Sequence, residues 1–177
     1  PSRGLGDVYK RQGAYRQLNE DPDYQLQGTD ALMEWMNSVN GRVSAELDGK
    51  DLTVPRGLRK VECAIDRAGS GGIFYTPPSD DLLRPGTMWW SVPAGQEVFH
   101  TWQELTTIFH EGMPGHHLQM GTALTQRATL NLWRRSVCWN SGHGEGWALY
   151  AEHLMAEHGY FDDPGYRMGL LDSRRLR

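Results

Sequence analysis

The segment FHEGMPGHHLQ, residues 109–119, constrains this chain more than any other part of its sequence. The preceding residues have helical periodicity, and His110 and Glu111 stand side by side as on the helix of a zinc hydrolase. Four residues after His110, where such a helix carries its second histidine, the sequence has Pro114. Because proline has no N–H and clashes with the carbonyl group four residues earlier, the helix must kink or bulge here. We therefore predict two helical segments with a break at 113–115.

The two histidines that follow the break are alternative partners for His110. On a regular helix, six residues turn His116 by about 600°, and seven residues place His117 about 10 Å along the axis. Neither can share an ion held at about 2 Å unless the backbone bulges at Pro114 and Gly115. A smaller bulge brings His116 to the missing position and a larger one brings His117. We favour His116 because it needs the smaller distortion, and both alternatives stay open at this point.

A third ligand should come from another segment, and a glutamate on a following helix is a common source. The segment GHGEGWALYAEHL, residues 142–154, offers Glu145 between two glycines that allow close approach of the backbone. Glu152 lies two turns further along the same face and can orient a histidine ligand through a hydrogen bond. His143 and His153 are further candidates.

The same residues also fit a helical scaffold without a metal. An adjacent His-Glu pair occurs by chance in many proteins, and Glu145 near a helix start is favoured by the helix dipole alone. Trp147 and Tyr150 are more typical of a packed core than of substrate contacts. The residues alone therefore do not decide between a metal site and a scaffold.

Short β-prone runs precede the motif. They are RKVECAI (59–65), GGIFYT (71–76) and TMWWSV (87–92). The first two flank a glycine-rich turn, which suggests a hairpin or two adjacent strands. The stretch 40–57 before them is polar and rich in turn residues, so we expect a loop or a helix end there.

Helical periodicity dominates the rest of the chain. Residues 13–39 have helical spacing with an interruption near Pro22, and residues 97–112 read as one helical segment. A later helix is expected with Ser141 as its N-cap and Gly159 as its C-cap. The expected fold class is α+β, with a small antiparallel sheet followed by a mainly helical region that carries the site.

Composition limits the classes of function. The chain has 177 residues, of which 38% are hydrophobic and 23% charged, with a formal net charge of −4. This composition suits one soluble globular domain, and no Lys/Arg cluster suggests nucleic acid as a partner. No apolar run is long enough to cross a bilayer. The two cysteines, Cys63 and Cys138, do not form a CxxC metal or redox motif.

Both ends of the sequence are unusual. The opening PSRGLGDVYKRQ, residues 1–12, resembles a translated sequencing adaptor, so we exclude it from the expected fold. The last residues, SRRLR, stop within an expected helix. We therefore expect a fragment of a longer enzyme, whose compartment and oligomeric state are not predicted.

Three motifs together resemble a known family. FHEGMPGHHLQ, GEGWALYAEHL and the upstream FYTPPSDDLLRPGTMWW occur in the order typical of the bacterial domain-of-unknown-function family 885. That family is similar to the gluzincin metallopeptidases, whose pattern is HExxH followed by a downstream glutamate. The resemblance implies that residues 13–177 are an incomplete gluzincin-like catalytic domain, without the family's helical N-terminal part and its C-terminal section.

The resemblance also implies roles for six positions. These are zinc ligands at His110, His116 and Glu145, a general base at Glu111, and cleft-lining residues at Tyr75 and Arg84. An arginine in the cleft can bind a carboxylate, although it can equally stabilise its own turn.

The expected reaction is hydrolysis of a peptide or amide bond with Zn²⁺ as cofactor. Glu111 would take a proton from the attacking water and pass it to the leaving amine. One alternative is a zinc hydrolase of non-peptide amides, and another is a non-catalytic relative that keeps the helices as a scaffold or binding module. An intact Glu111 argues against the second, because a structural site needs no unligated carboxylate beside its first ligand.

Overall fold

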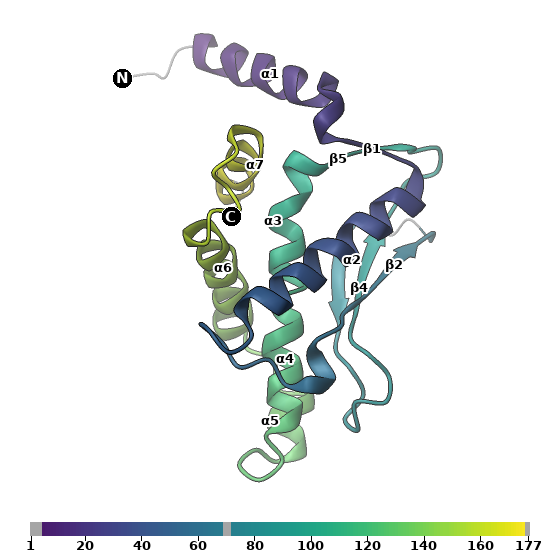
Figure 1. Cartoon of the computed structure of the whole chain (residues 1–177), viewed down its shortest axis with the longest axis vertical. Coiled ribbons are helices and arrows are strands. Elements are labelled where there is room, and N and C mark those ends of the chain that lie inside the picture. Colours follow the sequence, from purple (N-terminus) through teal and green to yellow (C-terminus); the bar gives the residue numbers. More distant parts are fainter. Residues whose placement is uncertain (1–4, 69–71, 176–177) are drawn as a thin grey trace.

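The computed structural model describes residues 5–68 and 72–175, with residues 5–8 as backbone only. The α-helices are α1 (Leu5–Glu20), α2 (Gly28–Leu47), α3 (Thr101–Glu111), α4 (His116–Thr125), α5 (Leu132–Ser136), α6 (Ser141–Glu157) and α7 (Pro164–Arg175). The strands are β1 (Gln25–Gln27), β2 (Glu62–Asp66), β3 (Ile73–Thr76), β4 (Thr87–Ser91) and β5 (Val98–His100). In Figure 1, α3 runs along the long axis, with α6 and α7 on one side and the sheet of β2 to β4 on the other. The expected α+β class is confirmed.

The strand order differs from the sequence expectation. β4 lies between β2 and β3, parallel to β2 and antiparallel to β3, so this sheet is mixed. The prediction that residues 59–65 and 71–76 form a hairpin or adjacent strands is wrong. β4 is the most buried of the three strands and lies at the centre of the sheet. The order of strands in a sheet cannot be read from hydrophobic periodicity and composition alone. A separate antiparallel pair is formed by β1 and β5.

The helices follow the predicted periodicity except at two boundaries. The interruption near Pro22 is confirmed, since a 3₁₀ turn at Pro22–Tyr24 and β1 separate α1 from α2. Helix α2 continues to Leu47, so the stretch 40–57 begins as a helix end. Residues 98–100, expected to be helical, form β5 because β1 offers a strand partner distant in the sequence.

The predicted cap of α6 is displaced by one residue. The side chain of Asn140, rather than that of Ser141, accepts a hydrogen bond from the backbone N–H of His143. Both residue types are good N-caps, so the sequence did not distinguish them. Gly159 follows the helix end with a φ of 81°, as expected for a residue that terminates a helix in the left-handed region.

Helix α3 is held in the core of the molecule. Buried side chains of α2, α3 and β4 form this core, among them Leu32, Met36, Val39, Ile108, Phe109 and Met88. On the opposite side, α7 approaches so closely that a Cβ atom on Gly169 would lie 1.8 Å from the carbonyl oxygen of Trp102. Packing on several sides therefore fixes the position of the helix that ends in the His-Glu pair.

Helix α1 includes residues 5–12 of the adaptor-like opening, and residues 1–4 lie outside the described residues. The proposed artefactual origin of this stretch stays a prediction. None of the described helices is both long and apolar enough to span a membrane.

Candidate metal centre

The helix is broken at the position that Pro114 predicts. α3 ends one residue before Gly112, and α4 begins one residue after Gly115. A Cβ atom on Gly115 would lie 1.9 Å from the carbonyl oxygen of His110, so only glycine allows the chain to pass this close to the end of α3. The break is thus a consequence of one residue that cannot continue a helix and one that tolerates the close approach.

Side chains from two other helices stabilise the break. The backbone N–H of Met113 donates to Oδ1 of the buried Asn40 on α2, at 2.8 Å. The indole N–H of Trp147 on α6 donates to the carbonyl oxygen of Pro114, at 2.9 Å. These bonds satisfy backbone groups that lose their helical partners at the break.

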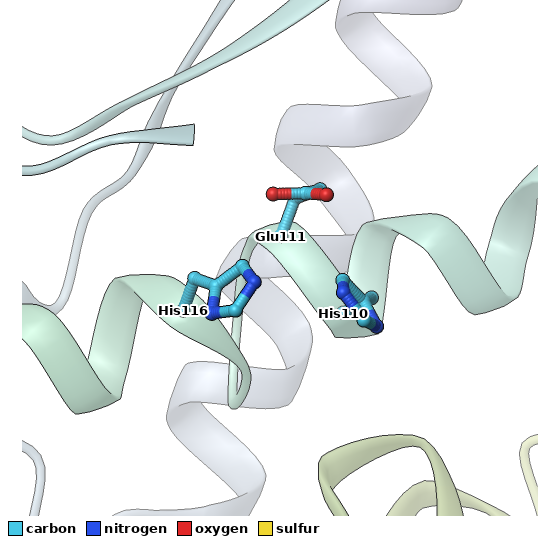
Figure 2. A group of neighbouring side chains, drawn as sticks. All are labelled: His110, Glu111 and His116. Carbon is cyan, nitrogen blue, oxygen red and sulfur yellow. The ribbon is translucent and has the colours of Figure 1, made fainter. Parts of the chain in front are cut away.

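The break brings His110 and His116 together. Their ring centroids lie 4.9 Å apart, with the rings nearly perpendicular at 85°. One ligand atom from each of His110, Glu111 and His116 lies within 4.8 Å of the others. Figure 2 shows His110 at the end of α3 and His116 at the start of α4, with the Glu111 carboxylate above the two rings in this view. The sequence prediction that a bulge would bring a later histidine back to His110 is confirmed.

Glu145 reaches both histidines from α6. Its Oε2 atom lies 3.2 Å from Nε2 of His110, and its Oε1 atom lies 3.8 Å from Nε2 of His116. Both distances are close to the separation of about 3.3 Å between ligands bound at about 2.0–2.1 Å in a tetrahedral zinc site. The Glu145 side chain is 50% exposed, whereas each histidine is 8% exposed, so the cluster is open to solvent on the α6 side.

Glu152 contacts the other nitrogen of His110. Its Oε1 atom lies 2.7 Å from Nδ1 of His110, and its Oε2 atom accepts a hydrogen bond of 2.8 Å from the Thr106 hydroxyl group. The Glu152 side chain is 1% exposed. An ionised Glu152 would accept a hydrogen bond from Nδ1 of His110, and Nε2 of the same ring faces Glu145.

This arrangement fits a bound cation. Nε2 of His110 and Oε2 of Glu145 lie 3.2 Å apart, so a cation bound between them would be coordinated by both atoms. A donor set of two imidazole nitrogens and one carboxylate is that of a catalytic zinc site. The residues present therefore fit zinc.

His117 points away from this cluster. Its Nε2 atom lies 2.8 Å from the carbonyl oxygen of Leu58, and its Nδ1 atom lies 2.9 Å from the hydroxyl group of Tyr75. Since a carbonyl oxygen accepts, Nε2 donates and Nδ1 accepts from Tyr75. Burial lowers the pKa of His117, which favours this neutral ring. Of the two alternative histidines, His116 is the one that converges on His110.

The two residues expected to line a cleft have structural contacts of their own. The hydroxyl group of Tyr75 on β3 forms a hydrogen bond with Nδ1 of His117, and burial raises the pKa of the Tyr75 hydroxyl group. The exposed Arg84 donates to the carbonyl oxygens of Pro77 and Pro85, at 2.9 and 3.4 Å, so it stabilises its own turn. A role for either residue in substrate binding stays a prediction.

The other candidate histidines lie elsewhere on α6. His153 pairs with Glu157 on the exposed face, and the exposed His143 lies against Gln119, with 3.4 Å between its Nδ1 atom and the amide nitrogen. Within the described part of the chain, the cluster of mutually close ligand atoms consists of His110, Glu111 and His116, so it lacks His143 and His153, and Glu145 joins the centre through its separate contacts with the two histidines. The roles of Asn40 and Thr106 were not predicted from the sequence. Asn40 could have been noticed, because it is a polar residue on the otherwise apolar face of α2.

The protein is thus an α+β protein with a cluster of histidine and glutamate side chains at a broken helix. Over residues 4–177 the chain matches the family described as "Bacterial protein of unknown function (DUF885)", and it belongs to that family. It is similar to the crystal structure of "the putative lipoprotein from Colwellia psychrerythraea", with 27% sequence identity and a TM-score of 0.74 over 89% of this chain. The chain spans 28% of that solved protein. No curated protein matches it.

Proposed function

We propose that this chain is the catalytic region of a zinc-dependent hydrolase that cleaves peptide or amide bonds. One observation carries the proposal. The Nε2 atoms of His110 and His116 face the two carboxylate oxygens of Glu145 at 3.2 and 3.8 Å, which suits a shared tetrahedral ion. His110, His116 and Glu145 are therefore the proposed ligands.

The neighbouring side chains have roles that follow from their contacts. When bound, zinc would polarise the scissile carbonyl group and lower the pKa of water to about 7. Glu111 accepts the proton of the attacking water and delivers it to the leaving nitrogen, because its carboxylate lies beside both histidines. Glu152 keeps His110 in the tautomer whose Nε2 faces the centre. The exposed side of Glu145 leaves room for a substrate to approach.

The resemblance of the FHEGMPGHHLQ motif to the HExxH pattern of gluzincin metallopeptidases, read from the sequence alone, favours a peptide substrate, and a non-peptide amide is the alternative substrate for the same chemistry. A non-catalytic scaffold is the alternative from another class of protein. The position of Glu111 beside the two histidines favours catalysis, because a purely structural ion needs no additional carboxylate there.

The test combines metal analysis with turnover. The 177-residue chain should bind about one equivalent of zinc. A full-length protein that includes this sequence should hydrolyse peptides from a mixed library. The Glu111→Gln variant should bind zinc without turnover. Glu157→Gln, an exposed change on α6, is the matched control and should retain both. Absence of zinc binding by the folded chain would refute the proposal.

A further inference from the structure

A pocket of about 530 Å³ lies beside the candidate metal centre, between the 77–84 turn, α4 and α5. Trp139 forms part of its wall and also contacts the centre, since its ring lies 5.6 Å from the ring of His116. The indole packs directly over α6, where a Cβ atom on Gly144 would lie 2.2 Å from it. Trp139 therefore connects this pocket to His116, one of the proposed metal ligands.

The pocket combines apolar walls with positive charge. Its apolar side chains include Met120, Leu124, Leu132, Val137 and Trp139. Its charged side chains are three arginines, Arg84, Arg134 and Arg135, and one aspartate, Asp80. Such a lining suits a ligand with an apolar body and a negatively charged group.

The single aspartate does not neutralise this charge. Asp80 is already paired with Arg135 and with Arg127, which lies 3.1 Å from its Oδ2 atom. Within residues 5–68 and 72–175, neither Arg84 nor Arg134 forms an ion pair with a carboxylate. Arginines without a carboxylate partner at the wall of a pocket attract an anion from solution.

One of the arginines also has a buried donor. The Arg135 side chain is 10% exposed, and its Nε–H has no hydrogen-bond acceptor among the described residues. A buried N–H of this kind is stabilised when a ligand supplies an oxygen atom. The planar guanidinium groups of arginine match the two oxygens of a carboxylate.

We propose that this pocket binds the free C-terminal carboxylate of a peptide substrate, with the last apolar side chain against Trp139 and Leu132. The inference rests on the proposed function, because the scissile bond must lie at the adjacent metal centre. It deepens that function by assigning cleavage near the C-terminus of the substrate. The apolar walls favour a terminal carboxylate next to a hydrophobic side chain over a glutamate or aspartate side chain.

The test measures binding to the metal-free 177-residue chain by titration calorimetry. The probes are acetyl-Phe-Leu as the free acid, the same peptide as its C-terminal amide, and acetyl-Glu-Leu amide. We expect the free acid to bind at least about tenfold more tightly than either amide. Arg134→Gln should weaken this preference, because Arg134 is an exposed member of the pocket whose replacement leaves the core and the other two arginines intact. Arg167→Gln, an exposed arginine of α7 outside the pocket, should retain it.

Zinc titrations of the same samples separate this inference from the proposed function. We expect Arg134→Gln to bind zinc as the unchanged chain does, since Arg134 is not a proposed ligand. Equal binding of free acid and amide, with zinc binding intact, would overturn the pocket assignment alone. Tight binding of acetyl-Glu-Leu amide would overturn the C-terminal assignment in favour of an acidic side chain. A preference for the free acid without any zinc binding would overturn the proposed function.

Discussion

His110 lies between two carboxylates of one helix, with Oε1 of Glu152 at 2.7 Å from its Nδ1 atom and Oε2 of Glu145 at 3.2 Å from its Nε2 atom. The two glutamates are seven residues apart on α6, which is about 10 Å along the axis. Each nitrogen of the His110 ring faces one of these glutamates, Nδ1 toward Glu152 and Nε2 toward Glu145. The spacing of Glu145 and Glu152 therefore determines which nitrogen faces the proposed metal.

We expect Glu152→Gln to weaken zinc binding about 10- to 100-fold, because a neutral amide holds the His110 tautomer less firmly and makes Nε2 a poorer ligand. Competition with a chromogenic chelator measures the zinc affinity. The exposed Glu157→Gln on the same helix is the control and should leave the affinity unchanged. Equal zinc affinities for Glu152→Gln and the unchanged chain would show that Glu152 has no role in orienting His110.

Substitution of Glu111 should separate metal binding from catalysis. Glutamine keeps the shape of Glu111 but cannot accept a proton at neutral pH, so Glu111→Gln should retain zinc and lose at least about 100-fold in kcat/KM. His110→Ala should lose both zinc and turnover. Metal content and peptide hydrolysis are measured on the same preparations. Turnover by Glu111→Gln at nearly the original rate would exclude Glu111 as the base.

The adjacent histidines should respond differently to replacement by alanine. His116→Ala should abolish tight zinc binding, because it removes a proposed ligand. His117→Ala should lower the unfolding free energy of the metal-free chain by about 2–4 kcal/mol, because it removes a buried side chain and leaves Leu58 and Tyr75 without their hydrogen-bond partner. Urea unfolding in chelator measures stability, and zinc titration measures binding. Loss of zinc binding in His117→Ala together with normal zinc binding in His116→Ala would mean that His117, and not His116, is the metal ligand.

Stability should depend on pH through Glu104 on α3. Burial raises the pKa of this carboxyl group to about 7, above its ordinary value of 4.5. A carboxyl group whose pKa is raised by folding contributes stability that is full below pH 4.5 and is lost as the pH rises through 7. Glu104→Gln should therefore become more stable than the unchanged chain by about 1–3 kcal/mol as the pH rises from 5 to 8.

Urea unfolding of metal-free samples at each pH measures this effect. The exposed Glu157→Gln provides the control and should show no pH-dependent difference. A constant difference between Glu104→Gln and the unchanged chain across this range would mean that Glu104 ionises normally in the folded state.

Local chemistry explains what could be predicted from the sequence. Pro114 lacks a backbone N–H and clashes with the carbonyl group four residues earlier, so the interruption of the helix followed from one residue. The seven-residue spacing of Glu145 and Glu152 placed both on one face of a helix, and their different contacts with His110 were predicted on that basis.

Features set by distant parts of the chain could not be predicted in this way. The position of β4 between β2 and β3 depends on which strands meet in the folded molecule. The smaller backbone distortion already favoured His116 over His117, but the contacts of His117 with Leu58 and Tyr75, which engage both of its ring nitrogens, could not be predicted.

A crystal structure of the chain grown with zinc, with anomalous diffraction recorded on both sides of the zinc edge, tests the central claim most directly. We expect one zinc ion at about 2.0–2.2 Å from Nε2 of His110, Nε2 of His116 and a carboxylate oxygen of Glu145, with Glu111 not ligated. A chain that binds no zinc in this experiment, or that binds it through His117 or His143 instead, would contradict the account.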